Sequence, residues 1–189
     1  MSYTRIAEAG NALVELLRHH LVPDVVKNPE HIGLVHPKDR GEYRVGVWLY
    51  DISECGELQS HSMITIDSRR QKYPSCYVRL FYMITAFSGS DVRYRAAEEH
   101  EILGKVIQVL KEYAVLEGLC GSSEEEMRCM ISLQNMSTED KMHIFNMRDE
   151  EYRTSLFYEL GPVEIESVKL RDVTRVVSTG FEAIDKREK

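Results

Sequence analysis

The chain has 189 residues, of which 43% are hydrophobic and 29% charged, so it is long enough for one domain with a sizeable core and too apolar to be disordered throughout. Its net charge of −7 disfavours a general nucleic-acid-binding protein, because such proteins are normally basic. The first residues lack the pattern of a secretory signal and no run of about 18 apolar residues occurs, so we expect neither a signal peptide nor a membrane span.

The chain begins with a predicted helix and two strands. Apolar residues spaced three and four apart between Ile6 and Leu21 form one stripe of a helix, which Pro23 ends. A short strand is expected at residues 32–35. Residues 42–52 alternate between two sets of side chains with a period of two, which is typical of a strand.

Residues 53–73 are polar, and we interpret them as a surface loop with one possible short strand at 62–66. This loop carries a basic cluster: Arg69, Arg70 and Lys72. Residues 75–87 form the clearest predicted strand, because their even-numbered positions are all apolar and the other positions are mostly apolar. A strand of this composition is expected at the centre of a sheet, covered on both faces.

The second half of the chain predicts alternating helices and strands. Residues 88–91 break the strand and cap a helix that we expect to run to about Leu116, with Gly118 as its stop. The expected buried face of that helix is Ile102, Val106, Val109, Leu110 and Tyr113. An acidic loop at 121–126, a strand at 127–133 and a helix from Ser137 or Thr138 to about Met147 follow.

Residues 151–160 alternate as a strand does, and we expect Gly161-Pro162 to turn the chain into a last strand near 163–168. The tail 174–189 is expected to be flexible. About three helices and five or six strands in mixed order predict one α+β domain over residues 1–173, with a mixed or mainly antiparallel sheet packed by the helices.

No catalytic constellation is recognisable in the sequence. His19 and His20 are adjacent on a helix and point about 100° apart, and the stretch around His100 lacks the second histidine of a zinc-protease helix. There is no GxSxG, GxGxxG or GxxxxGK[ST] motif, and the four cysteines form no CxxC pair, so we expect them to be reduced and packed. We therefore predict no catalytic, cofactor-binding or metal-binding residues, and a protein that is not an enzyme.

Two weaker features have ordinary explanations. The aromatic residues of the strand at 75–87 could stack on single-stranded nucleic acid, but their apolar surroundings favour a role in the core. The basic cluster in the loop could grip an anion in an enzyme cleft, but solvated surface charge is the commoner role of such a cluster.

Three segments resemble one known family. They are the strand Pro74–Phe87, the helix segment Glu98–Leu110 and the segment Tyr152–Ser167, which reads YRTSLFYELGPVEIES. Together they are similar to the N-terminal domain of the cap, or tail-terminator, proteins of extracellular contractile injection systems such as the antifeeding prophage and Photorhabdus virulence cassette particles. The resemblance extends from the first helix to about Val173.

This resemblance implies a tail-terminator-like fold and a structural function. Such caps form a six-fold ring on the baseplate-distal end of tube and sheath and end polymerisation. The implied partners are further copies of the chain, in a homohexamer, and the inner tube and sheath proteins; assembly would take place in the cytoplasm before the chain becomes part of a phage-tail-like particle.

We place the expected interface on exposed strand edges and basic residues, with the segment from Val163 to Thr179 as a candidate edge or arm able to accept a strand from a neighbour. The candidate residues are Arg69, Arg70, Lys72, Val163, Ile165, Val168, Arg171 and Arg175. Two alternatives remain at this point: another phage-tail assembly or joining protein, and a small-molecule enzyme with an anion-binding loop.

Overall fold

A six-stranded sheet, in the order β1-β2-β5-β8-β7-β6, organises the computed structural model, which describes residues 2–60, 62–116, 128–146 and 152–173. Only β1 and β2 pair in parallel, and the other neighbours in this sheet are antiparallel. The predicted α+β class with a mixed, mainly antiparallel sheet is therefore confirmed. The strands are β1 (Ile32–Leu34), β2 (Val45–Glu54), β5 (Cys76–Ala86), β8 (Ser155–Ile165), β7 (Cys129–Leu133) and β6 (Val115–Leu116).

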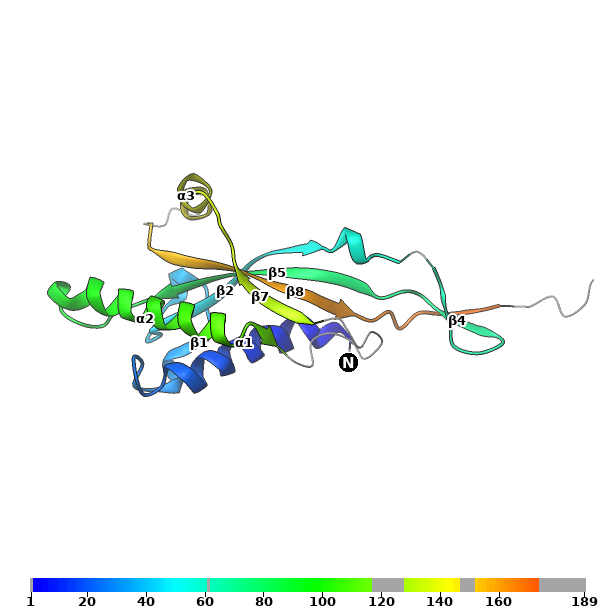
Figure 1. Ribbon diagram of the computed structural model, residues 1–189, viewed down its shortest axis with the longest axis horizontal. Coiled ribbons are helices and arrows are strands. Elements are labelled where there is room, and N and C mark those ends of the chain that lie inside the picture. Colours follow the sequence, from blue (N-terminus) through cyan, green and yellow to red (C-terminus); the bar gives the residue numbers. More distant parts are fainter. Residues whose placement is uncertain (1, 61, 117–127, 147–151, 174–189) are drawn as a thin grey trace, which may run out of the picture.

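Helices cover both faces of this sheet (Figure 1). Helices α1 (Arg5–Leu21) and α2 (Val92–Glu112) lie on one face, and the shorter α3 (Thr138–Asn146) lies on the other. Four short 3-10 turns complete the described elements: η1 (Ser2–Thr4), η2 (Pro29–His31), η3 (Pro37–Asp39) and η4 (Gly56–Leu58). No described helix is both long enough and apolar enough to cross a membrane.

Strand β5 lies inside the sheet and is packed on both faces, as its composition predicts. Its even-numbered side chains, among them Leu80 and Ile84, join the main core against α1 and α2. On the other face, Met83 packs with Phe157 of β8 and Phe145 of α3. The buried hydroxyls of Thr85 and Ser155 hydrogen-bond to each other at 2.8 Å, so these two polar groups are satisfied inside the core.

The first and third helices have the expected bounds. Most of the apolar stripe of α1 is buried, including Leu13, Leu17 and Leu21, and Ile6 and Leu16 are partly buried. The Ser137 hydroxyl accepts a hydrogen bond from the Asp140 amide at 3.1 Å, which identifies Ser137 as the residue that caps α3. Both helices therefore follow from local patterns that the sequence states directly.

Helix α2 ends earlier than predicted. It begins with Asp91, whose side chain accepts a hydrogen bond from the Arg93 amide, and it ends at Glu112. Val115 and Leu116 instead pair with β7 as strand β6. Tyr113, expected on the buried face, is 45% exposed and stacks on the His20 ring with centroids 4.2 Å apart. The open edge of β7 gives the chain a strand partner, and this tertiary contact overrides helix propensity.

The expected turn at Gly161-Pro162 is also wrong, because β8 runs through both residues. Gly161 and Pro162 lie opposite the single residue Arg79 of β5, between the pairs Leu80–Leu160 and Val78–Val163. This is a β-bulge, a site at which a proline without an N–H is tolerated in a strand. Glycine suits the neighbouring position, since a Cβ on Gly161 would lie 3.3 Å from the Arg79 Cα.

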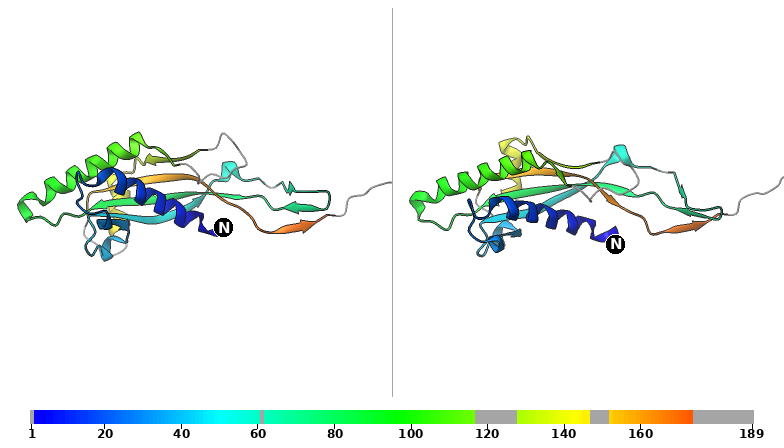
Figure 2. Two further views of the ribbon diagram at one scale, coloured as in Figure 1. Left: turned by 90° about the horizontal axis from the view of Figure 1, so that it is seen from below. Right: turned by 60° about the horizontal axis from the view of Figure 1, so that its bottom comes forward.

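A second sheet extends the molecule beyond its helices. It contains β3 (Ile64–Thr65), β4 (Arg70–Lys72) and β9 (Leu170–Asp172), in the order β3-β4-β9. We call residues 62–73 and 166–173, which carry this sheet, the arm. Figures 1 and 2 show the arm continuing outward from β5 and β8, with none of the described helices against either of its faces. The loop expected at 53–73 is therefore a hairpin for most of its length.

Several expectations fall outside the described residues. These are the helix stop at Gly118, the acidic loop at 121–126, Cys120 and the tail 174–189. Of the other cysteines, Cys55 and Cys129 are buried, as expected for packed side chains, and Cys76 is half-buried.

A glycine substitution tests how tightly β1 packs on the turn before β2. In Gly33→Ala, the new Cβ would overlap the Tyr43 ring edge and lie 3.0 Å from its Cζ, so we expect a loss of about 1–3 kcal/mol of unfolding free energy. Gly104→Ala is the matched control, because Gly104 is exposed in α2 and the new Cβ would meet nothing within 4 Å apart from the backbone of its own helix, so a gain of about 0.5–1 kcal/mol is expected. Urea unfolding measures both; a Gly33→Ala protein as stable as the parent would contradict this packing.

Candidate functional site

The arm gathers most of the predicted interface residues, although they lie about a hundred positions apart in the chain. Arg70 and Lys72 are in β4, and Arg69 immediately precedes it. Strand β9 pairs with β4 so that Arg171 lies directly opposite Gln71. The sequence predicts these residues singly, whereas the sheet places them on one small projecting structure.

One face of the arm carries half-exposed aliphatic side chains among charged ones. Ile64 of β3 and Leu170 of β9 both lie opposite Lys72, so the three side chains share a face. Ile66 follows two positions after Ile64, on the same side by strand alternation, and its amide donates to the Arg70 carbonyl at 3.1 Å. Ile64, Ile66 and Leu170 are 50%, 51% and 49% exposed. A sheet of three short strands that leaves such residues in water has the character of a docking surface.

Two carboxylates fix the shape of the arm. The Asp67 carboxylate accepts hydrogen bonds from the amides of Arg69 and Arg70, both at 2.8 Å, and from the Arg70 side chain, which closes the β3–β4 turn. Nearer the body, Lys72 Nζ lies 2.9 Å from the Glu166 carboxylate. The Lys72–Glu166 pair connects the hairpin to the segment that leads from β8 into β9.

These contacts make the order of the arm depend on pH. Hydrogen bonds, of which that from the Arg69 amide has the largest effect, lower the pKa of Asp67 below its ordinary value of 3.8. The Lys72 side chain likewise lowers the pKa of Glu166 below its ordinary value of 4.5. A carboxyl with a lowered folded-state pKa stabilises the fold above its ordinary pKa, and this contribution is lost as pH falls through the lowered value. We therefore expect amide-exchange protection of residues 69–73 to fall as the pH drops below the ordinary pKa values of these two carboxyls.

The matched variants for this prediction are Asp67→Asn and Glu166→Gln. Each should already show reduced arm protection at neutral pH and a weaker further loss in acid, because the titrating group is gone. Protection factors correct for the intrinsic pH dependence of exchange, and protection in the arm that stays constant down to pH 2 would contradict the role of these carboxylates.

The remaining predicted interface residues have different environments. Val163 was expected at an exposed strand edge, but it is fully buried in the main core, so it is not available as an edge residue. Ile165 is partly buried against that core, and Val168 is 88% exposed in the arm. Arg175 lies outside the described residues.

An apolar groove of about 480 Å³ lies between the first half of α1 and the sheet edge formed by β1 and β2. Tyr3, Ile6, Leu34 and Val47 are among its lining residues, and Leu34 is 46% exposed. Gly10 allows α1 to lie close to Leu34 and Tyr82, because a Cβ at this position would lie 3.2 Å from Leu34 and 3.3 Å from the Tyr82 hydroxyl. This groove could not be identified from the sequence, since its lining comes from four separate segments of the chain.

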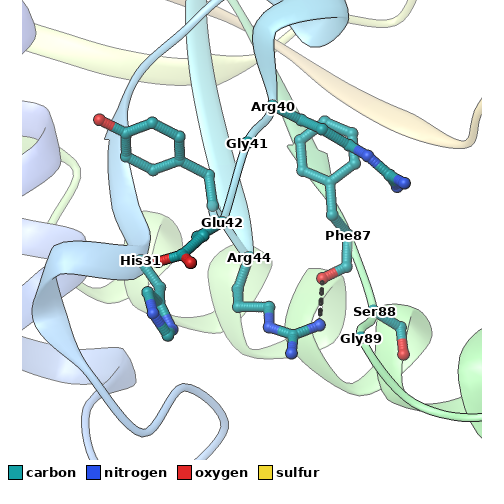
Figure 3. Close-up of a pocket in the computed structure, with 9 residues that line it drawn as sticks. His31, Arg40, Gly41, Glu42, Arg44, Phe87, Ser88 and Gly89 are labelled. Carbon is teal, nitrogen blue, oxygen red and sulfur yellow. Dashed lines mark hydrogen bonds between the residues drawn. The ribbon is translucent and has the colours of Figure 1, made fainter.

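A second cavity, of about 380 Å³, lies near the junction of β5 and α2 (Figure 3). Arg44 donates a long hydrogen bond of 3.5 Å to the Phe87 carbonyl and contacts the position where Gly89 has no side chain. The Ser88 hydroxyl donates to Glu98, and its amide donates to Glu99 at 3.1 Å. These contacts join the start of β2, the end of β5 and α2. They give Arg44, Ser88 and the two glutamates a structural role.

The enzyme alternative would place Arg69, Arg70 and Lys72 in an anion-binding cleft, but these residues line neither the groove nor the Arg44 cavity. His100 is exposed on α2. Within the described part of the chain, no group of three or more His, Cys, Asp or Glu is placed to hold a metal ion. The arm and the groove are thus the surfaces with the clearest capacity to bind a protein.

Comparison with known proteins gives one family and two solved structures. The model of the Pvc16 N-terminal domain family matches residues 8–179. The sheath/tube terminator of the PVC extracellular contractile injection system, in its extended state, has a TM-score of 0.65 and 18% identity, covering 96% of this chain and 64% of that one. The tube-terminating cap of the anti-feeding prophage has a TM-score of 0.58 and 19% identity, covering 94% and 61%.

These similarities establish a shared fold, and the chain spans less than two thirds of the length of either matched structure. No curated protein sequence matches it.

Proposed function

Because the chain belongs to the Pvc16 N-terminal domain family, we propose that it is a structural cap of a contractile injection system. Six copies form a ring on the baseplate-distal end of the inner tube and the sheath, and this ring ends polymerisation. Assembly takes place in the cytoplasm, and the cap then remains part of the phage-tail-like particle.

The observation that carries this proposal is the arm. It presents Ile64, Ile66 and Leu170 to solvent on a basic, projecting sheet that the described monomer leaves uncovered. A terminator needs surfaces of this kind, because it must bind its own copies and the last ring of the polymer. The family match and the fold shared with two terminator structures support the same conclusion.

The proposed function needs no catalysis. Binding energy at the end of a polymer is enough to stop growth, provided that the outer face of the cap offers no site for another subunit. Arg44 and Ser88, two of the polar residues that line the Arg44 cavity, are engaged in contacts between elements, which fits a structural role.

The first test is the mass of the purified chain in solution, alone and with the inner tube protein of the same particle. A mass near six protomers, in either condition, is the expected result, together with arrest of tube elongation when the cap is added. A protein that stays monomeric in both conditions and leaves tube growth unchanged would refute the proposal. Labelling the chain on intact particles adds a second test, because a cap must be found at the baseplate-distal end.

A further inference from the structure

The face of the arm that carries these side chains is left half-exposed by the described residues, and a partner that covers it must match its chemistry. Three half-exposed aliphatic side chains, Ile64, Ile66 and Leu170, lie on a sheet with strands of only two or three residues. A sheet this small gains stability when its apolar face is packed against another surface. A suitable partner surface must therefore be apolar, concave and wide enough to accept these side chains.

The groove beside α1 has those properties. Its volume is about 480 Å³, and its lining includes Ile6, Leu34 and Val47. Leu34 belongs to β1, the outermost described strand on its side of the sheet, and its side chain is 46% exposed there. Figures 1 and 2 show the arm extending away from the body of the molecule, which carries α1 and β1, and residues of those two elements line the groove.

Charge favours a second copy of the chain as the partner. The arm contains five basic side chains (Arg69, Arg70, Lys72, Lys169 and Arg171) and three acidic ones (Asp67, Glu166 and Asp172), a net charge of +2. The whole chain has a net charge of −7, so its other residues sum to −9. The described residues outside the arm contain 14 basic and 18 acidic side chains, a net charge of −4, so a basic arm is attracted toward the rest of a neighbouring copy.

We propose that the arm of one copy packs into the α1–β1 groove of the next copy. This inference rests on the proposed ring, and it assigns the contact that joins its subunits. The arm and the groove are different surfaces of the same chain, so the contact is head-to-tail, the kind of interface that closes into a ring when the rotation between subunits fits. Ile64, Ile66 and Leu170 then fill the space beside Leu34 and Ile6.

Two blocked variants test the contact. Ile64→Asp with Leu170→Asp blocks the arm, and Leu34→Asp blocks the groove. With tube protein present, each variant alone should lower the assembled mass from near six protomers to near one. Mixed together they keep one intact arm and one intact groove, so the mixture should give species near two protomers. The matched control is Met142→Asp, at an exposed position of α3 on the opposite face of the sheet. This variant should still form rings.

Cross-linking gives a readout that does not depend on how strongly a variant disturbs the fold. A Leu34→Cys chain and a Leu170→Cys chain, assembled together and treated with a short bismaleimide, should join as dimers, while a Met142→Cys chain with a Leu170→Cys chain should not. Rings that form without the Leu34–Leu170 cross-link, or that form from arm-blocked chains, would overturn this inference and leave the cap proposal standing. A parent protein that forms no ring, even with tube protein, would overturn both.

Discussion

Replacing Leu80 by alanine should lower the free energy of unfolding by about 2–5 kcal/mol, one of the two largest effects that the structure predicts. Leu80 is 0% exposed in the middle of β5, directly opposite Ile52 of β2 and Leu160 of β8. Its side chain is part of the core that joins the sheet to α1 and α2. Truncation leaves a cavity that well-packed neighbours fill only in part, which adds to the lost burial.

The matched control is Ile107→Ala on α2. Ile107 is 41% exposed, and alanine has a higher helix propensity than isoleucine, so we expect a change within about 0.5 kcal/mol. Urea unfolding followed by circular dichroism measures both variants. Equal effects of the two substitutions would show that β5 is not the packed centre of the fold.

The parts of the fold that were predicted correctly are those with a strong local period. The even-numbered apolar positions of 75–87 indicate a strand with both faces covered, and β5 has that environment. The stripe from Ile6 to Leu21 likewise predicts α1 to within one residue of its observed start. In these segments, burial repeats with the period of the secondary structure itself, so the sequence states both the element and its buried face.

The errors occur where a contact between distant segments decides the structure. Gly161-Pro162 has the composition of a turn, but the two residues form a β-bulge opposite Arg79 of β5, and β8 continues to Ile165. Residues 115–116 fit a helix locally, but the edge of β7 takes them as a strand. Neither partner could be identified from a local window, because strand pairing joins residues far apart in the chain.

The sequence indicated individual residues of the candidate site, but it did not indicate the sheet that brings them together. Arg69, Arg70, Lys72 and Arg171 were selected for charge and exposure, and β4–β9 pairing brings them together in the arm. Val163 was selected from the same strand-like segment, yet it points into the core. Strand alternation separates buried from exposed positions only once the register with β5 is known.

Reversing two charges in the arm should prevent assembly while leaving the monomer folded. Arg69→Glu with Arg171→Glu changes the arm from net +2 to −2, which turns attraction to the acidic body of a neighbouring copy into repulsion. Both residues are exposed, and the side chains that bind the Asp67 and Glu166 carboxylates are those of Arg70 and Lys72, which stay unchanged. The unfolding midpoint should therefore stay nearly the same. We expect the concentration needed for ring formation to rise at least about tenfold, measured by light scattering with tube protein.

The control for this prediction carries the same change in total charge at another place. Arg93→Glu with Arg95→Glu alters two exposed residues at the start of α2, away from the arm. If net charge alone governed assembly, the two double variants would weaken it equally. If the position of the charge matters, only the arm variant should fail, and its failure should lessen as added salt screens the new repulsion. Equal weakening by both variants would show that the basic arm has no specific partner.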